Sequence, residues 1–144
     1  MPREYQDYTF VVREVADRVM TRLVGSVFGK SPDTSPCVVF ARFADLPEWH
    51  RFFVQAHIGF WETWDDSTIE DELDECVDDE GRVVDFAPMV GGLPQQLRSA
   101  DSIVGKFDAS NIRLIFNNGV AFILSPDSAD LDTNFHVHTE SEIG

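Results

Sequence analysis

The chain is poor in cysteine, in basic residues and in long apolar runs, and each shortage excludes a class of protein. Cys37 and Cys76 form neither a CxxC pair nor a framework typical of secreted domains, so we expect two reduced thiols. No apolar stretch approaches the roughly 18 residues of a membrane span, and the first residues lack the basic flank and apolar run of a signal peptide. We therefore expect a cytoplasmic protein with no membrane contact.

Basic residues are scarce relative to acidic ones. The 144 residues include 11 Lys and Arg against 26 Asp and Glu, which gives a formal net charge of −15. Proteins bind nucleic acid largely through Lys and Arg that replace counterions at the phosphates. The composition thus argues against nucleic acid as a direct ligand and favours a basic protein as the partner.

The negative charge is concentrated in residues 62–80, called here the acidic segment, which hold eleven of the Asp and Glu residues and no Lys or Arg. Ser67 and Glu70 have the spacing of a capping box, and the apolar residues that follow recur on one narrow stripe. This pattern predicts a helix with carboxylates on its other faces. A concentrated field of one sign mainly speeds association with a partner of opposite charge. The alternative is a solvated face that keeps the protein in solution.

Large aromatic residues directly precede and enter this segment. Most of them are expected to pack in the core, because large aromatics dominate protein cores. Two tryptophans that lie beside carboxylates are instead candidates for the aromatic anchor of an interface with an acidic rim. The predicted partner-binding residues are Trp61, Trp64, Asp65, Asp66, Glu70, Asp71, Asp74, Glu75, Asp78 and Asp79.

Hydrophobic periodicity predicts helices in the first half of the chain. Apolar residues repeat every four positions between residues 9 and 28, with charged residues between them, which is typical of a long amphipathic helix. Asp45 and Pro47 resemble a helix start, so a short helix is expected over 47–56. Residues 37–43 and 82–87 read as strands, and 58–64 as either a strand or an aromatic loop.

The clearest local signal is a β-hairpin near the C-terminus. Two apolar runs, 112–116 and 120–124, flank Asn117-Asn118-Gly119, whose residue types favour a tight turn. Strands at 102–107 and 134–139 are expected beside it, with helices covering the sheet. The sequence therefore predicts a single α+β domain over residues 1–144. A long N-terminal amphipathic helix would pack on a mostly antiparallel sheet with a central C-terminal hairpin.

His136 and His138 fall on one face of the last predicted strand, and Asp130 and Asp132 lie just upstream. Such a pair can begin a metal site, but no third ligand stands at a recognisable spacing. The chain also has no GxSxG, P-loop, GxGxxG or HExxH motif. We therefore predict no metal, no cofactor, no catalytic residues and no enzymatic activity. The alternative is a small-ligand-binding or metal-dependent enzymatic α+β domain, with His136, His138 and Asp132 at the mouth of a pocket.

The hairpin segment from Asn111 to Leu124, in a small acidic chain without catalytic motifs, resembles the immunity proteins of bacterial polymorphic or contact-dependent toxin systems. The resemblance covers the last third of the chain. It implies a cytoplasmic α+β protein that binds a cognate toxin domain and blocks it without catalysis of its own.

The leading functional hypothesis is thus an inhibitor or immunity protein, monomeric or homodimeric. Its acidic helix and flanking Trp residues would block a basic partner, such as a toxin or a nucleic-acid enzyme. A second alternative is an acidic nucleic-acid mimic, although such mimics usually spread their charge over more surface than residues 62–80 provide.

Overall fold

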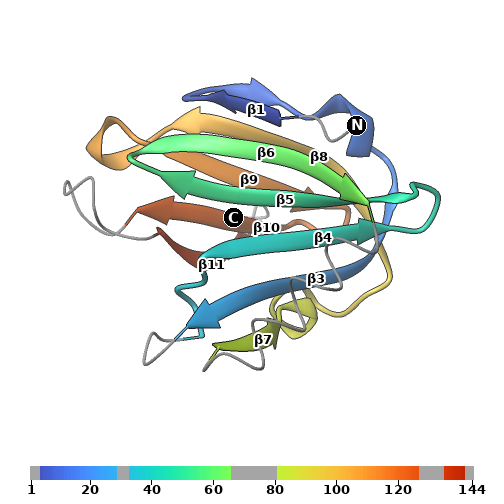
Figure 1. Cartoon of the computed structure of the whole chain (residues 1–144). Helices are drawn as coiled ribbons and strands as arrows, with labels where there is room; N and C mark the ends of the chain where they lie inside the picture. The colour runs from blue at the N-terminus through green and yellow to red at the C-terminus, as the bar shows by residue number, and fades with distance from the viewer. Residues whose placement is uncertain (1–3, 29–32, 66–80, 127–134, 142–144) are drawn as a thin grey trace.

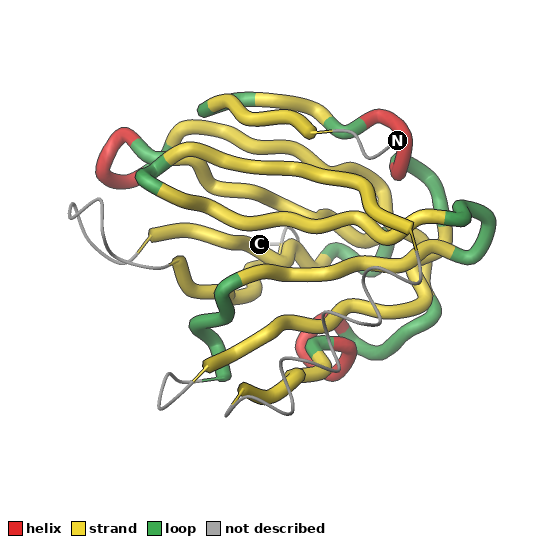
Figure 2. Tube along the Cα trace, in the orientation of Figure 1, coloured by secondary structure: helices red, strands yellow, loops and turns green. Residues whose placement is uncertain are grey.

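A computed structural model describes residues 4–28, 33–65, 81–126 and 135–141, and these fold as antiparallel strands that curl into two layers (Figure 1). The only helices among them are three short 3-10 turns, η1 (Arg13–Val15), η2 (Ala87–Val90) and η3 (Lys106–Asp108), shown in red in Figure 2. The strands are β1 (Glu4–Asp7), β2 (Phe10–Val11), β3 (Val19–Phe28), β4 (Val38–Phe43), β5 (Glu48–Gln55), β6 (Ile58–Asp65), β7 (Gly81–Asp85), β8 (Gln95–Val104), β9 (Ser110–Phe116), β10 (Val120–Pro126) and β11 (Phe135–Ser141).

The two layers are joined through β3. The first layer has the strand order β1-β6-β5-β4-β3, and the second has the order β8-β9-β10-β11. The start of β3 pairs with β8, with Val19 opposite Gln96, whereas its end pairs with β7, with Val24 opposite Asp85. The short strand β2 lies beside β8. The sheet therefore folds over on itself, and Figure 1 shows β5 and β6 in front of the strands of the second layer.

The core lies between the two layers and is filled by alternate side chains of both. Leu23 and Phe52 come from the first layer, Leu114 and Phe122 come from the second, and each is fully buried. Successive side chains of a strand point to opposite faces, so every second residue contributes to this core. Burial of apolar surface from both layers holds the sandwich together.

The predicted α+β fold with a long N-terminal helix over 9–28 is wrong, because this region forms β2, η1 and β3. A repeat of four residues is also a multiple of two, so it fits the face of a strand as well as that of a helix. In addition, the pairing of β3 with β4 shifts register between Met20 and Arg22. This bulge lets Met20 and Leu23, three positions apart, both face the core, which imitates helical spacing.

The short helix predicted over 47–56 is also wrong, since this range contains the whole of β5. His50, Phe52 and Val54 are buried on the inner face of β5, and the residues between them face the opposite side. The strands predicted at 37–43 and 82–87 are confirmed as β4 and β7, and residues 58–64, which the sequence left open between a strand and an aromatic loop, form most of β6. The helix predicted within the acidic segment lies outside the described residues.

The C-terminal hairpin is confirmed as β9 and β10. Gly119 has a φ of 89°, and its N–H donates to the carbonyl oxygen of Phe116 at 3.0 Å, so the turn uses the glycine in the left-handed region. β8 and β11 flank the hairpin on its two sides. The strand predicted at 134–139 is confirmed as β11, whereas the one predicted at 102–107 covers only the last three residues of β8 and runs into η3. The expected helical cover is wrong, because the opposite layer of sheet packs against the hairpin instead.

Candidate functional site

Trp61, one of the two predicted anchors, belongs to the core. It is 8% exposed, and its Nε1 donates to Nδ1 of His50 at 3.0 Å. The two rings stack with centroids 6.0 Å apart and planes 9° from parallel. Because β6 alternates in and out, Trp61 faces the interior while its neighbours at even positions face outward. In this structure Trp61 therefore presents no surface to a partner.

Trp64 lies on the outer face of the first layer and is half-buried. The guanidinium carbon of Arg51 lies 5.5 Å from the centre of its ring, and Nε of Arg51 is 3.5 Å from Oε1 of Glu62. The indole N–H of Trp64 donates to the same carboxylate oxygen at 3.4 Å. Arginine stacked on an aromatic ring is attracted by the negative face of that ring. The Trp64 ring thus already has a cation on one side in the protein itself.

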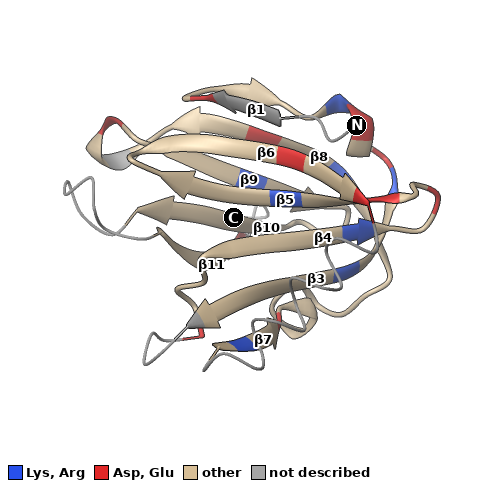
Figure 3. Ribbon diagram, viewed as in Figure 1, with Lys and Arg blue, Asp and Glu red and all other residues tan. Residues whose placement is uncertain are grey.

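Asp65 ends β6 and is exposed, and it stands directly opposite Glu48 of β5. Like charges at directly opposed positions of a sheet repel each other. Figure 3 shows further acidic and basic positions around this end of β6. In the neighbouring β4–β5 turn, Asp45 pairs with Arg18 at 2.6 Å. The acidic segment therefore starts from a strand end that already carries two opposed carboxylates. The other predicted contacts lie outside the described residues, namely Asp66, Glu70, Asp71, Asp74, Glu75, Asp78 and Asp79.

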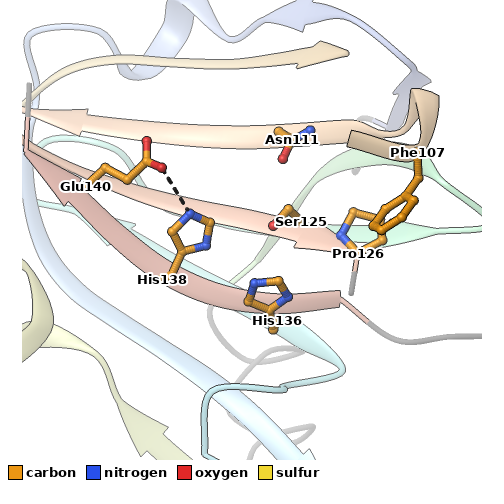
Figure 4. Close-up of a pocket in the computed structure, with 7 residues that line it drawn as sticks. All are labelled: Phe107, Asn111, Ser125, Pro126, His136, His138 and Glu140. Carbon is orange, nitrogen blue, oxygen red and sulfur yellow. Dashed lines mark ion pairs between the residues drawn. The ribbon is translucent and has the colours of Figure 1, made fainter. Parts of the chain in front are cut away.

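A second candidate site lies on the outer face of the second layer, where β11 places His136, His138 and Glu140 on one side by alternation. Ser125 of β10 is directly opposite His136. Figure 4 shows these side chains around a hollow that opens to solvent, with a volume of about 520 Å³. We call it the histidine hollow. It is lined by Phe107, Asn111, Ser125, Pro126, His136, His138 and Glu140.

The polar atoms of the histidine hollow converge from three strands. Nε2 of His138 lies 3.6 Å from Oε1 of Glu140, the pair joined by the dashed line in Figure 4. The rings of His136 and His138 are 5.4 Å apart between centroids and 25° from parallel. Nδ1 of His138 is buried and has no hydrogen-bond partner among the residues that the structure describes. Asn111 donates its side-chain N–H to the carbonyl oxygen of Ala109 at 3.1 Å.

The sequence identified the two histidines of this hollow but not their neighbours. Ser125 and Asn111 reach it from β10 and β9, and only the cross-strand register brings them beside His136. Phe107 comes from the turn before β9 and has a left-handed backbone, with φ of 61°. No residue spacing signals these contacts. Asp132, predicted at the mouth of a pocket, lies outside the described residues.

The protein is thus a two-layered antiparallel β-protein with two candidate sites on its surface. Within the described ranges, His, Cys, Asp and Glu form no group of three or more that is placed to hold a metal ion. None of the helices described is long and apolar enough to cross a membrane. Comparison with known proteins gives no match, because no family model fits the sequence and no curated protein or solved structure resembles it significantly.

Proposed function

We propose that the protein binds and blocks a basic protein partner through its acidic segment, as a cytoplasmic inhibitor or immunity protein without catalysis of its own. The observation that carries this proposal is the concentration of eleven carboxylates, with no Lys or Arg, within residues 62–80. So many like charges repel one another and oppose folding, and a role in binding would explain why the chain keeps them. A field of this kind accelerates encounter with a cationic surface.

The described part of the segment supports this proposal and modifies it. Trp64 is half-buried on the outer face of β6, Asp65 is exposed at the end of this strand, and Glu48 adds a further carboxylate from β5. Trp61 is omitted from the contact surface because it packs against His50 inside the core. The aromatic part of the proposed interface is therefore Trp64 alone, at the edge of a mainly electrostatic contact.

The test compares binding by the wild-type protein with binding by a variant of the acidic segment. The immobilised protein is exposed to host lysate at low salt, and a salt gradient then releases what it holds. We expect one basic protein to elute in a one-to-one ratio. The substitutions Asp71→Asn, Asp74→Asn, Glu75→Gln and Asp78→Asn together should slow its association at least tenfold, because they remove four charges from the steering field.

A matched control distinguishes a specific effect of the acidic segment from a general effect of the protein's net charge. The substitutions Asp7→Asn, Glu14→Gln, Asp17→Asn and Asp108→Asn remove the same number of charges at exposed or half-buried positions elsewhere, and they should leave the association rate within about twofold. An unrelated basic protein such as lysozyme serves as the probe for unspecific attraction. Equal slowing by both variants, or equal affinity for lysozyme and for the captured protein, would reject a specific role for the acidic segment.

A further inference from the structure

The histidine hollow contains a buried nitrogen atom whose lone pair has no partner. His138 turns Nε2 toward Oε1 of Glu140, at 3.6 Å, and Figure 4 shows its other nitrogen turned away from Glu140, toward His136 and Ser125. A neutral imidazole carries a proton on one nitrogen only. The carboxylate of Glu140 favours that proton on Nε2, which leaves Nδ1 as an acceptor. This atom is buried and meets no donor among the described residues.

We propose that His136 and His138 bind one divalent transition-metal ion of the zinc type in this hollow, with Glu140 as the positioning residue of His138. A buried acceptor without a partner destabilises the folded protein, and a bound cation would remove that cost. In known metal sites a carboxylate typically holds the outer N–H of a ligating imidazole and fixes its tautomer. Glu140 stands in that relation to His138.

The separation of the two rings suits a shared ion. With metal–nitrogen bonds of about 2.0–2.1 Å in tetrahedral geometry, the centres of two ligating imidazoles lie about 5 Å apart. The centroids of His136 and His138 are 5.4 Å apart. Residues two apart on a strand share a face, so the backbone of β11 holds both rings on the same side. Because the rings now stack 25° from parallel, rotation about the side-chain bonds has to bring one nitrogen of each ring to the same point.

The remaining chemistry of the hollow favours a borderline cation over an anion or a hard cation. Glu140 would repel an anion, and Arg113 on the same face is held by Asp101 through two hydrogen bonds, of 2.8 and 2.7 Å. These contacts also raise the pKa of Arg113. Imidazole nitrogen suits zinc, copper and nickel, whereas magnesium and calcium require a shell of oxygen ligands. Water and the hydroxyl of Ser125, opposite His136, are available for the open positions.

The proposal is tested by calorimetric titration of the full chain with Zn²⁺, and with Mg²⁺ as the hard-ion control. We expect one zinc ion per chain and no binding of magnesium at the same concentrations. His138→Gln, which keeps the size and polarity of the side chain, should weaken zinc binding at least 100-fold. Glu140→Gln should weaken it about 10-fold to 100-fold, as is typical when a carboxylate behind a metal ligand is changed.

Two controls keep the result specific. Thr139→Ala changes the residue between His138 and Glu140 in β11 and should leave zinc binding unchanged. Cys37→Ser with Cys76→Ser should also leave it unchanged, which excludes the thiols as ligands. The proposal is overturned if the wild-type chain takes up no zinc, or if His136→Ala and His138→Gln variants that retain the circular dichroism spectrum of the folded protein bind zinc as tightly as wild type.

Discussion

Single side chains show how far the local sequence can mislead about exposure. Trp61 and Trp64 are three residues apart, flank the same carboxylate and look equivalent in the sequence, yet only the first is buried. An odd separation places two residues on opposite faces of a strand. Trp61 and Trp64 differ in burial because residues 58–65 form a strand. The sequence alone left this region open between a strand and a loop.

Replacing these two residues by phenylalanine should have unequal effects on stability. Trp61→Phe removes the N–H that His50 accepts and leaves a void in the core, so we expect the free energy of unfolding to fall by about 2 kcal/mol. Trp64→Phe acts on a half-buried surface position and should lower it by less than about 1 kcal/mol. Denaturant unfolding measures both values. Equal losses would contradict the inward orientation of Trp61.

At the level of elements, the β5–β6 connection is a two-residue turn in which both residues have positive φ. Gln55 pairs with Ile58, and between them Ala56 has a φ of 51° and His57 a φ of 67°. This is the geometry of a type I′ turn, which favours Asn and Gly rather than Ala. His57 is buried and its ring stacks on Phe107, whereas Ala56 is exposed. The strain at Ala56 can therefore be relieved without loss of packing.

Ala56→Gly should raise the free energy of unfolding by about 0.5–1 kcal/mol, because glycine adopts the left-handed region without steric cost. The matched control is Ala44→Gly in the β4–β5 turn, an exposed position without positive φ. It should instead be neutral or destabilising, since glycine there only adds freedom to the unfolded chain. Denaturant midpoints compare the two variants. A loss of stability in Ala56→Gly would refute the turn geometry.

Strands in this chain could be predicted where the residue types of a turn determine the local backbone conformation. Asn117-Asn118-Gly119 encodes its own turn, and the apolar runs beside it can only be strands of a hairpin. Residues 9–28 were misassigned because a bulge near Met20 breaks the alternation that would have identified β3. The histidine hollow was half predictable, since His136 and His138 share one strand, whereas Ser125 is brought there by register alone.

On the scale of the whole molecule, a net charge of −15 on 144 residues acts on stability as well as on binding. Repulsion between carboxylates destabilises the compact state, and salt screens it over a Debye length of about 10 Å at 0.1 M. We expect the melting temperature to rise by a few degrees between low and moderate sodium chloride concentration. Calorimetry measures this shift.

The variant that lacks the charges of Asp71, Asp74, Glu75 and Asp78 provides the comparison. It should melt at a higher temperature than wild type at low salt and respond less to added salt, because part of the repulsion is already gone. A melting temperature that does not depend on salt in either protein would show that repulsion among these carboxylates does not limit stability.

The pairing of β1 and β2 with distant strands limits the order in which this protein can fold during synthesis. Glu4 of β1 lies opposite Glu62, and Phe10 of β2 lies opposite Ser102, so during synthesis β1 and β2 wait for partners made much later. Pairings over such sequence separations close slowly, because the chain must lose the entropy of a long loop before it gains the contact. β1 has no partner before β6 has emerged, and β2 has none before β8 has emerged. During synthesis, the N-terminal strands therefore remain exposed edges that depend on rapid completion of the chain, or on a chaperone, to avoid pairing with another molecule.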